Sequence, residues 1–396
     1  MKFVLNLALA SLAASVSIRS PSVNLYEGTK VYHVKTGRHS ADVQKRLADV
    51  PHNVWESASD HIDVAIPRNE VARFESLGLD TRVLHTDPGA SIAAEAKVKS
   101  KWKRQDFNTS GDWFDSYHPY EDHIDYFREL QESFPDNSNW TSSGTSYEGR
   151  DIYGIHMWGA GGPGKPAVLW HGTVHAREWI VAPTLEYLTK QLIDGYKSGD
   201  NLTQSFLNSY DFYIFPIVNP DDRLWRKNRQ PPPATAANQT CYGRDLNRNW
   251  EHGWDANTRG ASSNECSQNY RDGQFIVCPF GYDEYLYAPP LGRWTRAASL
   301  MSQEIAWTSS NQTTYTFGPG GAVLYTTTGA AIDHVYAVGR AEWSYAIELP
   351  DTGHFGHVIP PERIRPAAEE SWVGQKVLLS LLDEVFFDEE GPAMFC

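Results

Sequence analysis

The sequence predicts a mixed α/β protein, in which a mixed, doubly wound sheet with helices on both faces follows a small α+β open sandwich. Residues 22–86 alternate short strand-like and amphipathic helical segments. From residue 116 onward, nearly continuous apolar runs alternate with helical patterns, as in sheets that helices cover on both faces. The chain has 396 residues, 41% of them hydrophobic, which suits a globular protein of two domains.

The net charge argues against two classes of partner, and the N-terminus predicts secretion. The formal net charge of −14 argues against binding to nucleic acid or anionic membranes, because both need a basic face. Residues 1–17 carry one Lys, a short apolar run and then small residues, which predicts a secretory signal peptide rather than a membrane anchor. We therefore expect a secreted, extracellular protein.

Sequons and cysteines agree with secretion. Five sequons predict glycosylation, at Asn108, Asn139, Asn201, Asn238 and Asn311. Four cysteines in an oxidising compartment are expected to form disulfides. Cys241 and Cys266 flank a short loop-rich stretch and are the first candidates, whereas the pairing of Cys278 and Cys396 stays open.

The N-terminal segment predicts the open sandwich. Strand-like alternation occurs at 30–36, 61–67 and 80–86, and amphipathic helices are expected at 40–50 and 68–78. The order β-α-β-α-β suits helices on one face of a sheet.

A basic helical stretch, 91–104, ends in Lys103–Arg104. It is either a solvated linker or a propeptide hinge cut after the dibasic pair, and its place between two compact segments favours the hinge. The chain is thus divided into a signal peptide (1–17), a propeptide domain with its basic linker (18–104) and a larger domain (105–396).

The larger domain contains the long patterns. Helical periodicity predicts helices at 120–134, 182–196 and 367–386. Apolar runs predict strands at 167–172, 210–220 and 343–350, the first of them buried.

Potential chemistry begins directly after the first of these strands. His175 and Glu178 form a His-x-x-Glu pair, at the carboxyl end of a strand where ligand sites gather in α/β sheets. Such a pair can supply two ligands to a metal, whereas a catalytic zinc normally takes three. Alone the pattern is weak, since a structural histidine would also satisfy it.

Three further segments add functional groups. Arg and Asn side chains in 222–229 and 243–250 could bind a carboxylate through forked hydrogen bonds. Glu348 lies in an apolar strand, where an unpaired carboxylate is costly to bury. It is either salt-bridged at the rim of the core or a general base beside a metal-activated water.

Taken in order, five motifs resemble the secreted zinc metallocarboxypeptidases of the pancreatic carboxypeptidase A/B type, in a fungal-like version. The resemblance runs from about residue 22 to the C-terminus. It implies the zinc carboxypeptidase fold, a Zn²⁺ cofactor and removal of single C-terminal residues from peptides and proteins. The motifs are HAREW (175–179), RLWRKNR (223–229), DLNRNW (245–250), GAVLY (321–325) and IELPDTG (347–353).

The resemblance also implies the roles of the reacting groups. His175 and Glu178 would be zinc ligands. Glu348 would act as the general acid/base, and Arg226 would polarise the scissile carbonyl and stabilise the oxyanion.

The substrate-binding groups follow from the same resemblance. Asn247 and Arg248 would hold the terminal carboxylate, Tyr325 would close over it, and Arg177 and Arg223 would line the groove. Ile332 at the specificity position favours apolar or aromatic C-terminal residues. A shift of one residue would place Asp333 there instead and favour basic ones.

The implied partners are peptide or protein C-termini as substrates and the propeptide as an intramolecular inhibitor until cleavage near Arg104. A monomer is expected, without nucleic-acid or membrane partners.

The chain departs from the family where the third zinc ligand, a His, is expected. Tyr270, Arg271 and Asp272 stand in place of a His-Ser-Tyr segment, so the domain is incomplete near 271–273, and a smaller omission falls at 221–222. Asp272 and His171 lie near enough in sequence to be considered as the third zinc ligand, but proximity is their only support, and we expect neither to bind the metal. Three hypotheses stay open: a gene assignment that omits coding segments of an ordinary enzyme, an inactive pseudo-carboxypeptidase with an extracellular binding or structural role, and a fragment that does not fold stably.

Overall fold

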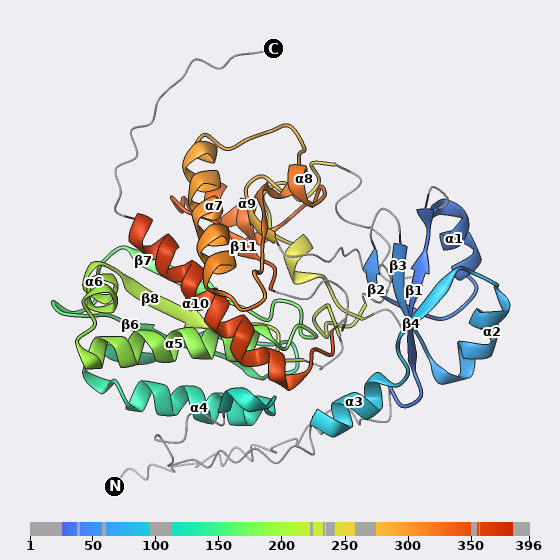
Figure 1. Ribbon diagram of the computed structural model, residues 1–396, viewed down its shortest axis with the longest axis horizontal. Helices are drawn as coiled ribbons and strands as arrows, with labels where there is room; N and C mark the ends of the chain where they lie inside the picture. The colour runs from blue at the N-terminus through green and yellow to red at the C-terminus, as the bar shows by residue number, and fades with distance from the viewer. Residues whose placement is uncertain are drawn as a thin grey trace, which may run out of the picture.

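The computed structural model describes residues 26–37, 40–57, 61–95, 113–221, 225–232, 234, 242–257, 275–349, 355 and 357–382. They form an N-terminal unit (described within 26–95) and a larger unit (described within 113–382), drawn from blue to red in Figure 1. The expected signal peptide, the Lys103–Arg104 pair, Arg223, residues 270–272, Cys241, Cys266 and Cys396 lie outside the described residues. Parallel and antiparallel strand pairs occur together, which confirms the predicted mixed α/β class.

The N-terminal unit is a four-stranded antiparallel sheet with two helices on one face. Its sheet order is β2-β3-β1-β4. The sequence predicted three of these strands and missed β2. Tyr32 and Val34 of β1 pack with Leu47 of α1 and Phe74 of α2, so both helices cover the same face. The elements are β1 (Lys30–Lys35), α1 (Ser40–Leu47), β2 (Asn53–Ser57), β3 (His61–Ile66), α2 (Val71–Ser76), β4 (Thr81–His85) and α3 (Pro88–Glu95).

The larger unit holds two sheets within the described residues. Their strand orders are β5-β6-β8-β7 and β10-β9-β11. The strands are β5 (Ser138–Thr145), β6 (Asp151–Met157), β7 (Ala167–His171), β8 (Asp211–Phe215), β9 (Phe275–Cys278), β10 (Thr316–Pro319) and β11 (Ala346–Ile347). The helices are α4 (Tyr120–Glu132), α5 (Val181–Ser198), α6 (Asn201–Ser209), α7 (Leu291–Thr308), α8 (Gly320–Val323), α9 (Ala331–Ala337) and α10 (Ile364–Leu381).

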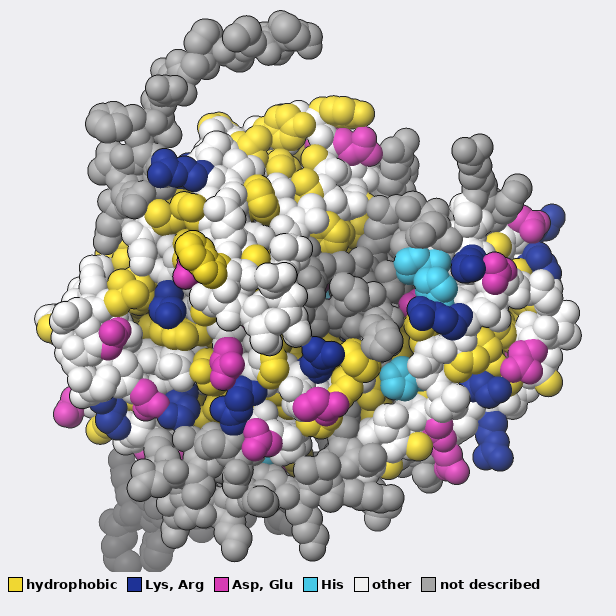
Figure 2. Space-filling view, in the orientation of Figure 1, with side chains coloured by type: hydrophobic (Ala, Val, Ile, Leu, Met, Phe, Trp, Pro, Cys, Tyr) yellow, Lys and Arg dark blue, Asp and Glu magenta, His cyan; other side chains and the backbone are white. Residues whose placement is uncertain are grey.

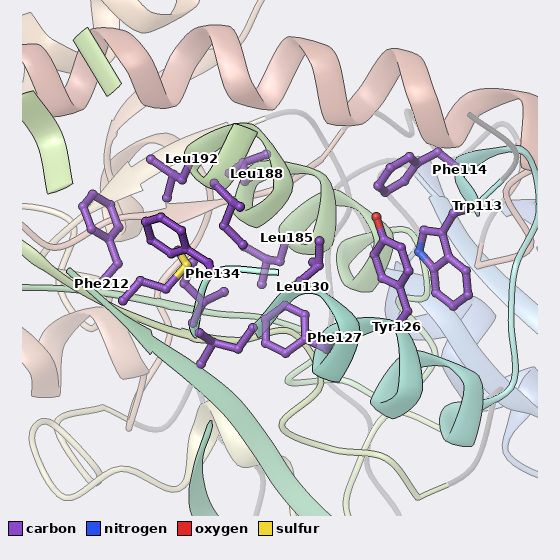
Figure 3. Close-up of a cluster of buried hydrophobic side chains, with 14 of the residues drawn as sticks. Trp113, Phe114, Tyr126, Phe127, Leu130, Phe134, Leu185, Leu188, Leu192 and Phe212 are labelled. Atoms are coloured by element: carbon purple, nitrogen blue, oxygen red, sulfur yellow. The ribbon is translucent and has the colours of Figure 1, made fainter. Parts of the chain in front are cut away.

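The main core fills the space between the first sheet and its helices. Phe212 and Ile214 of β8 belong to one buried cluster with Phe127 of α4 and Leu188 and Leu192 of α5. Figure 3 labels most of these side chains. Each aliphatic or aromatic side chain buried in this way contributes about 1.5–3 kcal/mol. Helix α10 adds side chains to this cluster and also to the cluster of β9 and α7, so it joins the two halves of the larger unit.

Strand β7 differs from its prediction as a buried strand. Its residues alternate between exposed and partly buried, and the side chain of Leu169 is 52% exposed. Val168 and Trp170, on the other face, pack against the main core. The alternation arises because the main core covers only the face with Val168 and Trp170, and among the described strands β7 lies at the edge of its sheet.

The sequons, one cysteine and the helices bear on three further expectations. The three described sequon residues Asn139, Asn201 and Asn311 are exposed. The expectation that the four cysteines form disulfides does not hold for Cys278, which is a free, buried thiol, and burial raises its pKa to about 12. Among the described residues, no helix is both long enough and apolar enough to span a bilayer.

Candidate active site

The loop after β7 is held against the end of β8, its neighbour in the sheet. Thr173 adopts a positive φ of 52° and donates its hydroxyl proton to the carbonyl of Pro216 at 2.9 Å. The side-chain amide of Asn219 donates to the carbonyl of Val174 at 3.1 Å. The same amide lies 3.4 Å from the carbonyl of Arg226, so Asn219 ties together the two loops that carry His175 and Arg226.

His175 is buried between two carboxylates. Its Nδ1 lies 2.7 Å from Oε1 of Glu178, and its Nε2 lies 3.3 Å from Oδ1 of Asp245. Arg226, whose side chain has no exposed surface, donates through Nε to Oδ2 of Asp245 at 2.8 Å. Its Nη1 lies 3.2 Å from Nδ1 of His175. The structure thus brings three predicted residues together and adds Asp245 to them.

The charges of this cluster shift one another's pKa values. Burial and the Arg226 cation would lower the pKa of His175, but the carboxylates of Glu178 and Asp245 outweigh them and raise it. Burial would raise the pKa of Asp245, but Arg226 and His175 hold it well below its usual range. Burial opposes ionisation of Glu178 too, yet His175 and Arg226 lower its pKa. The carboxylates are therefore ionised at neutral pH.

His175 and Glu178 fit a zinc ion as two of its ligands. Asp245 occupies the Nε2 side of His175, and Nδ1 is directed at Glu178, with Nη1 of Arg226 also 3.2 Å from it. A carboxylate on the far nitrogen of a ligating His is the usual support of a metal site. Two atoms bound to one zinc at about 2.0–2.2 Å lie roughly 3–3.5 Å apart, slightly more than the observed separation. Among the described residues, no third His, Cys, Asp or Glu completes this pair.

The predicted carboxylate-binding residues also lie together. Arg248 donates through Nη2 to the hydroxyl of Tyr325 at 2.9 Å. Asn247 accepts at Oδ1 from the backbone N–H of Ala331 at 2.8 Å, and its own N–H donates to Oδ1 of Asp245 at 2.9 Å. The short turn 246–248 therefore connects the carboxylate-binding group to the His175 cluster through Asp245.

Ile332 and Asp333 open helix α9 and face different surroundings. Ile332 is partly exposed, and its Cδ1 lies beside Gly320, where a Cβ would be 3.6 Å away. Asp333 is buried, and both its oxygens accept from the backbone N–H of Gly281, at 2.9 and 3.1 Å. Asp333 thus supports the loop at Gly281 from within the protein.

Asp333 gives a pH-dependent stability. Burial raises its pKa from 3.8 to about 7, against the backbone donors at Gly281 and Tyr282. Between these values the folded state binds a proton that the unfolded state has lost, so the free energy of unfolding falls as pH rises from about 4 to about 7, by about 3 kcal/mol. We expect urea unfolding to show that the free energy of unfolding of Asp333→Asn does not fall in this way across the same pH range. If the free energy of unfolding depends on pH as steeply in Asp333→Asn as in the wild type, this prediction is wrong. Asp115→Asn, at an exposed aspartate, is the control.

Glu348 and Arg177 lie at the borders of this region. Glu348 directly follows β11, is partly exposed, and its backbone N–H donates to the carbonyl of Phe275 at 2.9 Å. Arg177 is buried, and its guanidinium donates to the carbonyls of Val54 and Trp55 in the N-terminal unit, at 3.3 Å each. Arg223 lies outside the described residues.

Sequence reasoning missed two residues that organise the region, Asp245 and Asn219. Asp245 lies two residues before Asn247, and Asn219 lies at the end of the apolar run 210–220. The available signal was a short polar residue beside expected functional groups. Its role could not be predicted, because its partners are distant in sequence.

Comparison with known proteins identifies the family. A family model described as zinc carboxypeptidase matches residues 123–274 and 273–374. The chain is 35% identical over 432 residues to a metallocarboxypeptidase A-like protein of Trichophyton verrucosum, covering 95% of this chain and 99% of the relative. It is 34% identical over 431 residues to metallocarboxypeptidase A of Trichophyton tonsurans, covering 96% and 99%.

Solved structures share the fold. The crystal structure of thrombin activatable fibrinolysis inhibitor superposes with a TM-score of 0.78 at 22% identity, covering 90% of this chain and 98% of the other. Carboxypeptidase A from Helicoverpa armigera superposes with a TM-score of 0.71 at 24% identity, covering 91% and 100%.

The alignments also bear on the missing ligand. The two segments of the family match meet at residues 273–274, beside Tyr270 and Asp272. The alignment to the Trichophyton verrucosum relative, over 432 residues, is longer than this chain of 396. The relative therefore has residues for which this chain has no counterpart.

Proposed function

Because this chain belongs to the zinc carboxypeptidase family, we propose that it is a secreted exopeptidase that removes single C-terminal residues, preferably apolar or aromatic. The observation that carries the proposal is the position of Asp245. It contacts His175 and Arg226 on one side and the backbone of Asn247 on the other. Asp245 thereby fixes Arg226, which would act on the reacting carbonyl, beside Asn247, which would bind the terminal carboxylate. Cleavage of the last peptide bond requires these two groups side by side.

In this proposal His175 and Glu178 hold the zinc ion, which when bound supplies Lewis-acid activation of water and of the scissile carbonyl. Glu348 accepts the proton of the attacking water and returns it to the leaving amine. Arg226 already lies beside His175, and its guanidinium stabilises the negative charge that develops on the carbonyl oxygen.

The remaining residues bind the substrate. Arg248 and Asn247 hold the terminal carboxylate, since Arg offers paired donors that match it. Tyr325, already hydrogen-bonded to Arg248, closes over that carboxylate. Ile332 presents an apolar side chain to the last residue, and the burial of Asp333 against Gly281 supports this assignment over the basic preference. Arg177 and Arg223 line the groove.

Zinc content and hydrolysis test the proposal together. The protein, cut near Arg104, is loaded with zinc and given N-blocked peptides that end in Phe or in Lys. We expect one zinc bound at His175 and Glu178, removed by His175→Ala, and faster release of Phe than of Lys. Binding of the peptides without turnover would instead establish the pseudo-carboxypeptidase. If the protein neither binds zinc at this pair nor hydrolyses the peptides, the proposal is overturned.

The transcript separates the remaining explanations for the absent third ligand. Sequencing across the codons for Tyr270–Gly273 shows whether the natural chain contains a histidine there. If it does, the restored chain is the one to assay, and it is expected to exceed the present chain in zinc affinity by more than the 10–100-fold typical of a supporting residue.

We further propose that the N-terminal unit inhibits the enzyme until the linker is cut. The carbonyls of Val54 and Trp55 cap Arg177, which stands between His175 and Glu178 in sequence. The ring of Trp55 packs 5.6 Å from that of His357, and His85 contacts the carbonyl of Phe355 at 3.0 Å. These contacts support the proposal, because those at Arg177 are made to the loop that carries the proposed zinc ligands.

Trp55→Ala is expected to raise the kcat/KM of the uncleaved protein about 30-fold, because losing a buried aromatic anchor costs an interface about 2 kcal/mol. Activity of uncleaved and cleaved protein is measured with the same blocked peptide. Trp307→Ala, which changes a tryptophan that is 86% exposed on α7, is the control and should have no effect. Full activity of the uncleaved wild type would exclude inhibition by this unit.

A further inference from the structure

Two histidines and an aspartate gather on the helix-free face of the N-terminal sheet. β1 and β3 pair antiparallel with His33 opposite Asp63 and Lys35 opposite His61. His61 stands two residues before Asp63 on the same strand, so all three side chains share one face. The other face carries Tyr32, Val34 and Val64 and packs on helices α1 and α2. Figure 2 shows histidine side chains on this unit, on the side turned toward the larger unit.

The three side chains are close enough to share one ion. Nδ1 of His33 lies 2.8 Å from Oδ1 of Asp63, and the rings of His33 and His61 have centroids 4.2 Å apart. One ligand atom from each residue lies within 4.8 Å of the other two. This is the one group of three such donors among the described residues, and it is separate from His175 and Glu178.

Burial and charge favour a cation at this place. The side chain of Asp63 is only 3% exposed and that of His33 20%, so the carboxylate is removed from water on the wall of the sheet. A neutral imidazole offers one ring nitrogen as a metal ligand, and an ionised carboxylate offers its oxygens. Two imidazoles and a carboxylate are a donor set that zinc and similar transition ions prefer over Ca²⁺ or Mg²⁺.

We propose that His33, His61 and Asp63 form a second, structural binding site for a divalent transition metal ion of the zinc type. The ion would cross-link β1 and β3, the two central strands of the sheet order β2-β3-β1-β4. The same face carries Val31 and Ala65, which pack with Trp55 and with Val358 of the larger unit. Metal binding therefore stiffens the surface that contacts the larger unit, so that metal supply also stabilises the N-terminal unit.

The test uses the full chain with the proposed catalytic ligands removed, as the His175→Ala/Glu178→Ala variant. The metal-free protein is titrated with zinc alone, by calorimetry and by equilibrium dialysis. We expect one zinc per chain and a rise in Tm on binding. Adding Asp63→Asn, or His61→Ala, should weaken binding more than the 10–100-fold that loss of a supporting residue causes.

His52→Ala is the matched control, because His52 lies in the same unit with Nδ1 on the carbonyl of Val50 and is no member of the cluster. It should bind zinc as the parent variant does. Circular dichroism shows whether each variant keeps its fold, and the near-isosteric Asp63→Asn carries the conclusion if His61→Ala unfolds. The proposal is overturned if the His175→Ala/Glu178→Ala variant does not bind zinc. It is also overturned if adding Asp63→Asn leaves zinc binding unchanged. This result is independent of the enzyme assay, so either proposal can fail alone.

Discussion

Replacing Glu348 by Gln is expected to lower kcat/KM for an N-blocked peptide ending in Phe by about 10²–10⁴-fold, the usual contribution of a general acid/base. The amide keeps the shape of the side chain but cannot accept the proton. Glu348 follows β11, whose pairing with β9 and the bond from its own N–H to Phe275 fix its backbone. Zinc content, measured alongside, should not change.

Glu342→Gln is the matched control for this variant. Glu342 is an exposed glutamate six residues earlier, and the contacts that tie it to Trp294 and Arg293 use its backbone carbonyl. It should retain wild-type activity. A Glu348→Gln protein with more than about one tenth of wild-type kcat/KM would remove Glu348 from the proton transfer.

Replacing Asp245 by Ala is expected to lower the free energy of unfolding by about 3–5 kcal/mol, the cost of breaking a buried ion pair from one side. The Nε of Arg226 would lose its partner at 2.8 Å, and the side chain of Arg226 has no exposed surface through which water could replace it. His175 would lose the acceptor on its Nε2 side and Asn247 the acceptor of its N–H. Urea unfolding with a chelator present measures the effect without metal.

A surface ion pair supplies the comparison. Asp115 contacts Arg365 at 3.1 Å, with side chains that are 60% and 38% exposed, so Asp115→Ala should cost less than about 1 kcal/mol. If Asp245→Ala costs no more than Asp115→Ala, then the Asp245 cluster adds nothing to stability. Asp245→Asn, which keeps an acceptor for the Asn247 N–H, is expected to fall between the two.

The long amphipathic patterns were predictable because each helix buries one stripe against a sheet. The helices predicted at 120–134, 182–196 and 367–386 correspond to α4, α5 and α10, with ends that differ by a few residues. Strand β2 was missed because five residues with one apolar alternation give too little pattern. Its assignment comes from pairing with β3, a contact that the sequence does not show.

The site was predictable in its parts and not in its arrangement. His175, Arg226, Arg248 and Tyr325 were identified through motifs, and the structure places each beside a partner. Asp245 was missed because its role depends on a histidine 70 residues away and an arginine 19 residues away in sequence. A continuous apolar run likewise predicted a buried β7, yet side-chain burial depends on which elements cover each face of the strand, and the core covers only one.

The edge at β7 has a consequence for handling the protein. Among the described strands β7 lies at the edge of its sheet, and the side chain of its Leu169 is 52% exposed, an arrangement that favours pairing with an extended chain. We therefore expect strand addition between copies at this edge, and precipitation when the protein is concentrated. The same edge is an attachment point for engineering, because a short synthetic strand that pairs with residues 167–171 would act as a detachable stabiliser of the larger unit.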